Sequence, residues 1–361
     1  MVKILRRWAG QYFSEEEPVV FLLLLTLTGV CVWLFGGILT PVIASVIIAY
    51  MLQGLVNLLT ERGAPHTLAV SLAVVFFIGV ALALMLVLMP LVWSQLTSFF
   101  SDFPQYTADL EESLVGLSAQ YPHILSPAQL DEWFALARSE IGQIGQFLVS
   151  IGVSSIPGVI TILIYFVVVP LMVFFFLKDK DYFLESLQSI LPKKRRMLND
   201  VGEEMNEQIA NYIRGKVIEI VIVGVATYIG FAVLGLQYSA LLALLVGLSV
   251  LIPYVGATVV TVPVAMVGLI QWGVGSELAT LMIVYLVIQA LDGNVLVPLL
   301  FSEAVNLHPV VIIVAVLFFG GLWGFWGIFF AIPLATLIKA IMTAWPKVAS
   351  HQEMAPSIDA E

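Results

Sequence analysis

The sequence predicts an all-α polytopic membrane protein with about eight transmembrane helices, and three observations support this fold class. Of its 361 residues, 60% are hydrophobic and only 11% are charged, whereas soluble domains carry about 25% charged residues. The apolar segments are roughly 17–25 residues long, the length of an α-helix that spans a ~30 Å hydrocarbon core. The alternating segments of about ten residues that are typical of outer-membrane barrels are absent. We therefore expect broken or re-entrant helices in the C-terminal half and amphipathic helices on both membrane sides.

The N-terminal segment and the first three spans occupy residues 1–93. Residues 1–18 are polar, and no small-x-small cleavage pattern follows, so we expect the first span to be retained rather than removed as a signal peptide. The dipeptide Gly36-Gly37 predicts a turn that joins the first two spans in a tight hairpin. The predicted spans of this part are Val19–Phe35, Ile38–Leu59 and His66–Trp93.

Two polar regions separate the spans in the middle of the chain. Residues 94–152 are acidic and predict an extracytoplasmic region of short amphipathic helices. One of these helices starts at Leu130, and its apolar stripe would lie on the membrane, on a neighbouring subunit or on the protein's own core. The fourth span lies within residues 153–180. Residues 181–213 predict two cytoplasmic amphipathic helices whose basic residues either follow the positive-inside rule or contact anionic lipid.

Residues 214–342 have the features of a transport core. After a fifth span over Val217–Leu234, the apolar segments become short and are interrupted by Pro and Gly, which is typical of the substrate region of transporters. The sequence leaves open whether residues 240–272 and 307–340 are re-entrant or cross the membrane fully. Residues 343–361 are expected to form a disordered cytoplasmic tail. The predicted hinges of the core are Pro253, Gly256, Gly293, Pro298, Gly324 and Pro333.

The positions of the basic residues predict that both termini are cytoplasmic. With the N-terminus inside, the predicted spans place every Lys and Arg on the cytoplasmic side except Arg138. This threading requires that residues 307–340 form a hairpin, because Lys339 must lie on the inside. No basic residue lies between Lys216 and Lys339, so the acids of that interval have no cation in their own segment.

Asp292 is the principal candidate for a functional residue. A carboxylate in an apolar segment costs about 2.5–3.5 kcal/mol on insertion scales, so a functional role is the default hypothesis. Removed from water, this carboxyl would bind a proton or pair with a metal cation. The alternative is that Asp292 lies at a helix end in the membrane interface and is solvated there. The predicted substrate-binding or ion-binding residues are Asp292, Asn294, Gln289, Glu219, His308 and Asn306.

Several of the other candidates also have a simpler structural interpretation. Glu219 follows Lys216 closely in the sequence and would pair with it. Gln289 lies one helical turn before Asp292, and its amide would make an ordinary interhelical hydrogen bond. His308 opens a helix and would then be an interfacial residue.

Other classes of function lack their motifs. The phosphate-binding pattern G-x-x-x-x-G-K-[ST] is absent, so we do not expect ATP-driven transport by this chain. The four histidines have no metal-ligand spacing, and the single Cys31 can form neither an intrachain disulfide nor a metal cluster. We therefore expect no enzyme, no cofactor, no bound metal centre and no nucleic-acid partner.

The chain resembles the autoinducer-2 exporter family, the PerM-like permeases, over nearly its whole length. The resemblance implies a bacterial inner-membrane protein of about eight spans that transports a small solute. In this family autoinducer-2 export is assigned to some members and sodium/proton antiport to others. The resemblance also implies a homo-oligomer, and it implies that an acidic residue is common at the position of Asp292. The matching elements are Phe175–Asp179, Tyr212–Lys216, Ile252–Gly256, Gln289–Pro298, Val305–Pro309 and Gly324–Ala335.

The sequence therefore predicts a permease that exports or exchanges a small solute, with coupling to protons or sodium at Asp292. A passive channel and a non-transporting membrane scaffold are the two alternatives. The expected partners are the small-molecule or ion substrate, membrane lipid and further copies of the chain.

Overall fold

The computed structural model describes residues 16–120, 156–191, 196–253, 255–301 and 307–352, together with six separate residues between 121 and 155. Within these ranges the chain is almost entirely helical and contains no strand. Six of the described helices are long and apolar enough to cross a membrane, and three shorter apolar helices accompany them. The predicted all-α polytopic fold class is therefore confirmed.

The first helix corrects the predicted hairpin. Helix α2 runs from Glu16 to Glu61 without interruption, so the chain does not leave the helical conformation at Gly36-Gly37. Glycine permits a turn but does not impose one. In an apolar environment a continuous helix satisfies every backbone hydrogen bond, whereas a loop would not.

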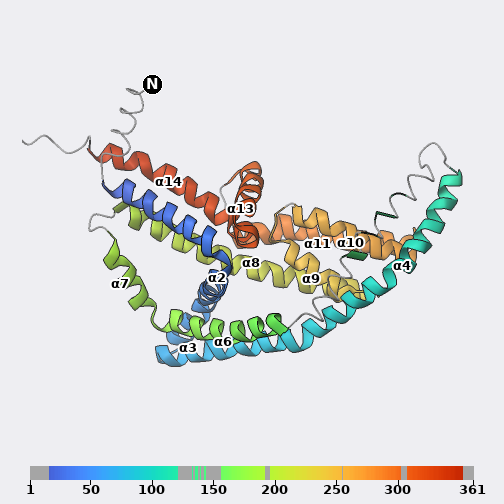
Figure 1. The fold of residues 1–361 in the computed structure, drawn as a ribbon, viewed down its shortest axis with the longest axis horizontal. Helices are drawn as coiled ribbons and strands as arrows, with labels where there is room; N and C mark the ends of the chain where they lie inside the picture. The colour runs from blue at the N-terminus through green and yellow to red at the C-terminus, as the bar shows by residue number, and fades with distance from the viewer. Residues whose placement is uncertain are drawn as a thin grey trace, which may run out of the picture.

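Helix α2 nevertheless changes direction between its two ends. Phe21 packs in the same cluster as Met205, and the Tyr50 hydroxyl donates a hydrogen bond of 2.7 Å to the Asn206 side chain. A straight helix from Phe21 to Tyr50 would be about 44 Å long, so both ends can lie beside adjacent residues of one helix only if α2 bends. Pro41 lies inside α2 and removes one backbone donor there. Figure 1 shows the two parts of α2 running in different directions.

The remaining described helices of the N-terminal half are α3 (His66–Ala83), α4 (Met89–Gln120) and α6 (Ile156–Lys178). Helix α3 continues through a π-helical turn, η1 (Leu84–Leu88), into the long helix α4. Helix α6 matches the predicted fourth span. In Figure 1, α3 and α6 lie side by side along the lower edge of the molecule, and α4 rises from there along its right-hand side. A shared apolar cluster joins α2, α3 and α6, and its fully buried members include Ala69, Val70, Ala73 and Val173.

Two predictions about the region after residue 93 meet the structure in different ways. The start of residues 94–152, expected to form short helices, is instead part of α4, which continues through Pro104 as far as Gln120. The amphipathic helix predicted from Leu130 lies outside the described residues apart from six isolated positions. Helix α4 also contacts the first turn of the helix that begins at Ser239. There the Gln95 side chain accepts a hydrogen bond of 2.8 Å from the Leu241 backbone N–H.

Helix α8 is the central element of the structure. After α7 (Lys180–Ile190), helix α8 runs from Arg196 to Val233, so one helix joins the predicted amphipathic segment to the predicted fifth span. In Figure 1, α2 and α14 lie along its first half, and α9 and α11 lie along its second half. The first half of α8 is too polar to span a membrane alone, but it is continuous with the apolar second half in one helix.

The next two helices form a hairpin. Helix α9 (Ser239–Ser249) and helix α10 (Val255–Trp272) are joined by a turn that contains Pro253. Gly256 makes this turn so tight that a Cβ atom at this position would overlap the carbonyl oxygen of Ser249. The predicted division of residues 240–272 into two short pieces is therefore what the structure shows.

A broken helix follows the first hairpin. Helix α11 (Ser276–Leu291), the π-helical turn η2 (Asp292–Leu296) and helix α12 (Val297–Phe301) form one continuous segment. A π-helical turn leaves the regular hydrogen-bond ladder of the α-helix, and such turns occur frequently at functional sites. The predicted break at Gly293 falls inside η2.

The last two helices form a second hairpin. Helix α13 (Pro309–Phe329) contains a reversal at Gly324, where φ is 59° and ψ is −133°. Gly327 lies so close to Phe319 that a Cβ atom would overlap the Phe319 carbonyl oxygen, which is impossible in a straight helix because these residues would be about 12 Å apart. The returning arm continues as α14 (Ala331–Gln352), so residues 307–340 form the predicted hairpin. The tail predicted to be disordered is helical as far as Gln352.

Candidate functional site

Both hairpins and the broken helix meet α8 at a cavity of about 490 Å³. The α9–α10 hairpin reaches this cavity with its tip, through Ser249 to Pro253 and the first turn of α10. The α13–α14 hairpin contributes Ile312 and Ile332 from its two arms. Apolar clusters lie on two sides of the cavity, one around Val246 and Val264 and the other around Phe329 and Ile332. The polar and charged side chains of the lining are Tyr212, Lys216, Glu219, Ser249, Thr258, Gln289 and Asp292.

Two opposite charges of α8 are buried at this cavity. The Lys216 ammonium donates a hydrogen bond of 2.7 Å to Glu219 Oε2, and the two residues are only 4% and 2% exposed. Lysine and glutamate are almost never so deeply buried unless they are paired. The simpler interpretation of Glu219, an ion pair with Lys216, is thus what the structure shows.

The Lys216 ammonium has two further partners outside α8. It donates a second hydrogen bond, of 2.9 Å, to the carbonyl oxygen of Val250. Val250 is the C-terminal cap of α9, and carbonyl groups at this end of a helix have no partner within it and attract cations. The ammonium also lies 5.2 Å from the centre of the Phe301 ring. Gly215 leaves room for that ring, since a Cβ atom there would be 2.6 Å from Phe301.

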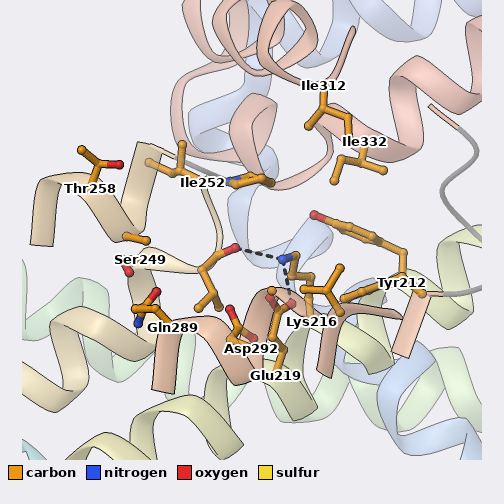
Figure 2. Close-up of a pocket in the computed structure, with 16 residues that line it drawn as sticks. Tyr212, Lys216, Glu219, Ser249, Ile252, Thr258, Gln289, Asp292, Ile312 and Ile332 are labelled. Carbon is orange, nitrogen blue, oxygen red and sulfur yellow. Dashed lines mark hydrogen bonds and ion pairs between the residues drawn. The ribbon is translucent and has the colours of Figure 1, made fainter. Parts of the chain in front are cut away.

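Asp292 and Gln289 present unpaired polar atoms at the same cavity. Asp292 Oδ1 and Gln289 Nε2 are buried, and neither has a hydrogen-bond partner among the residues that the structure describes. Buried polar atoms are nearly always paired, so two such atoms facing one cavity mark a place where a ligand, an ion or a water would find hydrogen-bond partners. Figure 2 shows both side chains on the same side of the cavity, with the Asp292 carboxylate beside Glu219. Lys216 acts electrostatically on Asp292 as well as on Glu219.

Tyr212 attaches the second hairpin to α8. Its hydroxyl donates a hydrogen bond of 2.9 Å to the Phe329 carbonyl oxygen, which lies at the end of α13. Tyr212 is 2% exposed. Its ring packs against those of Phe301 and Phe329, with centroid distances of 5.9 Å and 6.0 Å. Lys216 and Tyr212 thus contact different hairpins from positions one helical turn apart.

The structure does not bring all predicted binding residues to the cavity. Asn294 is exposed and donates to the Ala290 carbonyl oxygen one turn earlier, at 2.8 Å. His308 caps α13 by accepting from the Val310 N–H at 3.3 Å, so it matches the simpler interpretation. Neither residue lines the cavity. Asn306 lies outside the described residues.

The predicted hinges also divide into two groups. Pro253 and Gly293 line the cavity, and Gly256 and Gly324 lie where the two hairpins reverse. The two remaining prolines, Pro298 and Pro333, lie in the first turns of α12 and α14. Because α12 continues directly from η2, Pro298 removes one backbone donor inside a continuous helical segment, next to the π-helical turn.

Sequence reasoning missed Lys216 and Tyr212 as site residues. Both belong to the segment Tyr212-Ile213-Arg214-Gly215-Lys216, in which Arg214 is exposed and the other four residues are buried. A lysine that enters an apolar span just before a glutamate was a usable signal. A second cavity, of about 710 Å³ between α2, α7 and α8, is larger, but none of the predicted binding residues lines it.

Apolar helices interrupted around a buried polar cavity are the arrangement by which membrane transporters form a substrate site. Comparison with known proteins supports this class. The sequence model of the family described as AI-2E family transporter matches residues 21–347, and the chain therefore belongs to this family. It is a multi-pass membrane transporter of a bacterial permease family.

Individual relatives agree with the family assignment. PerM of Escherichia coli (strain K12), named as a candidate permease, is 46% identical over 353 residues, which cover 98% of this chain and all of PerM. YueF of Bacillus subtilis (strain 168), named as a candidate transport protein, is 27% identical over 83% of this chain and 82% of its own length. YrrI of the same organism is 29% identical over 84% of this chain and 85% of its own length. The family resemblance predicted from the sequence motifs, with PerM as a near relative, is confirmed.

Proposed function

We propose that this protein moves a small solute across the bacterial inner membrane through the cavity at Lys216, Glu219 and Asp292, and that a proton or sodium ion bound at Asp292 drives the movement. The unpaired Asp292 Oδ1 carries this proposal. A buried carboxylate oxygen without a partner is costly, and a cation or a proton would offset that cost.

The charges that line the cavity indicate how much positive charge the site accepts. One ammonium faces two carboxylates, and the described lining contains no other charged side chain. When both carboxylates are ionised, the site carries a net charge of −1. One monovalent cation or one proton would therefore make the site neutral, which favours the binding of a single coupling ion at a time.

The two hairpins supply elements that can move relative to α8. Only the tip of α9–α10 and two side chains of α13–α14 form their side of the cavity. Helices broken by Gly and Pro at a substrate site are the elements that open and close in alternating access. We propose that movement of the α9–α10 hairpin relative to α8 and to the α13–α14 hairpin exposes the cavity to one membrane side at a time, and that both termini are cytoplasmic.

Flux in proteoliposomes would test the role of Asp292. The solute is first identified by comparing the metabolites exported by cells that lack the protein and by complemented cells. Purified wild-type protein should then transport it at a rate that depends on pH or on the sodium gradient. Asp292→Asn should lose that dependence and at least about tenfold in rate, equivalent to ~1.4 kcal/mol.

Glu277→Gln is the matched control. Glu277 is an exposed carboxylate in the first turn of the same broken helix, so its loss should leave transport unchanged. If Asp292→Asn keeps the wild-type dependence on pH and sodium, the coupling role of Asp292 is wrong. Single-channel currents in planar bilayers would instead identify a passive channel.

A further inference from the structure

The Lys216 ammonium is already a cation in the proposed ion site. It is buried and lies in hydrogen-bond contact with Glu219, and it acts electrostatically on Asp292 across the cavity. Glu219 therefore has a cation partner, whereas Asp292 Oδ1 has none. The same ammonium cannot neutralise both carboxylates, so the site always contains one carboxylate more than its own positive charge can balance.

No other charged group is positioned to replace Lys216. Residues 235–276, which include the whole α9–α10 hairpin, contain no Asp, Glu, Lys or Arg, and neither does α13. The first charged residue of α14 is Lys339, which does not line the cavity. The charge balance at the cavity thus depends on Lys216, Glu219 and Asp292 alone among the described residues.

We propose that Lys216 is a built-in competitor of the coupling ion, and that its ammonium moves from Glu219 to Asp292 when the ion leaves. In the structure the ammonium is bound to Glu219 and Val250, and Asp292 is free to accept a cation or a proton. This inference rests on the proposed function and specifies how the same site works.

The contact with Val250 connects this exchange to a hairpin. While the ammonium is bound to Glu219, it also holds the end of α9 through the Val250 carbonyl oxygen at 2.9 Å. When the ammonium moves to Asp292, it loses this hydrogen bond, and the tip of the α9–α10 hairpin is released from α8. Lys216 is a positioning residue in this scheme, because it acts on the hairpin and need not touch the solute.

Two variants separate competition from a structural role. In Glu219→Gln the ammonium has only Asp292 as an anionic partner, so it should occupy Asp292 and weaken ion binding by about tenfold or more. In Lys216→Met/Glu219→Gln the competitor is absent, so ion binding at Asp292 should return to the wild-type level or become tighter. Loss in the single variant and recovery in the double variant is the expected result.

Binding is measured on the purified full-length protein in detergent, without a transport assay. One probe is the radioactive sodium ion, whose binding is counted directly. The other probe is the proton, whose uptake is followed with an indicator dye between about pH 5 and 9. Lys216→Met/Glu219→Gln should recover ion binding but not transport, because Val250 has lost its donor. A purely structural ion pair would not produce this separation of binding from transport.

Two results would overturn the inference alone. One is an unchanged ion affinity of Glu219→Gln in a protein whose wild-type binding depends on Asp292. The other is a folded Lys216→Met/Glu219→Gln protein, verified by thermal unfolding and size-exclusion chromatography, that does not recover binding. If wild-type protein binds neither sodium nor protons through Asp292, the proposed coupling itself fails, and the inference fails with it.

Discussion

The two hairpins of the C-terminal half are built alike but are attached to α8 by different chemistry. Each reverses where a glycine lies against a backbone carbonyl, Gly256 against Ser249 and Gly327 against Phe319. Each also offers a carbonyl oxygen at a helix end to a side chain of α8. The α9–α10 hairpin accepts from the Lys216 ammonium, whereas the α13–α14 hairpin accepts from the uncharged Tyr212 hydroxyl.

This difference indicates that only one hairpin responds to the ion. The strength of a hydrogen bond from an ammonium depends on the charges around it, whereas a bond from a neutral phenol hardly changes with them. The α9–α10 hairpin also reaches the cavity with its tip, and the α13–α14 hairpin does so only with its arms. We therefore expect the first hairpin to move with the ionic state of the site and the second to serve as its fixed counterpart.

The largest effect should come from the two glycines that lie against backbone carbonyls beside the reversals of the hairpins. Gly256→Ala and Gly327→Ala place a Cβ atom against rigid backbone, so each should destabilise the fold by about 3 kcal/mol or more. Thermal unfolding followed by circular dichroism measures this. Gly37→Ala is the control: a Cβ at that helical position meets nothing within 4 Å, and alanine should be neutral or slightly stabilising. If Gly256→Ala is equally harmless, the tight reversal of the first hairpin is wrong.

An effect of similar size should come from Lys216→Met alone. This change leaves the Glu219 carboxylate buried and unpaired, which should cost about 3–5 kcal/mol. Lys216→Met/Glu219→Gln should recover most of that loss, because no uncompensated charge remains. The comparison uses midpoints of thermal unfolding at one ionic strength. A double variant no more stable than Lys216→Met would show that the buried pair is not the cause.

The smallest effect should come from Tyr212→Phe. The change removes one hydroxyl and leaves the Phe329 carbonyl without its donor, so a loss of about 1 kcal/mol is expected. Because this contact is uncharged, the loss should be the same with and without sodium and across neutral pH. A loss that varied with the ion would contradict the assignment of α13–α14 as the fixed hairpin.

The sequence predicted the broken helices better than the continuous ones. Pro253 and Gly256 marked the first hairpin, and the glycines around Gly324 marked the second, because a short apolar segment cannot cross a membrane alone. Gly36-Gly37 gave a similar signal and was wrong. Glycine permits a turn without imposing one, and α2 continues through both glycines as a helix.

The site was predicted only in part, for a related reason. Asp292, Gln289 and Glu219 were found because each is a polar group in an apolar segment. Lys216 was overlooked because it stands at the edge of the predicted span, where a lysine normally extends to the membrane surface. Its burial depends on the Val250 carbonyl and the Phe301 ring, which are 34 and 85 residues away in the sequence and which no local pattern reveals.

The spacing of the two anchoring side chains on α8 restricts how this segment can vary. Tyr212 and Lys216 face the same way because four residues make slightly more than one turn of an α-helix. Inserting or deleting one residue between them would rotate one anchor by about 100° relative to the other, and one hairpin would lose its donor. Natural variants of this chain should therefore tolerate substitutions of the exposed Arg214 more readily than any change in the length of the segment.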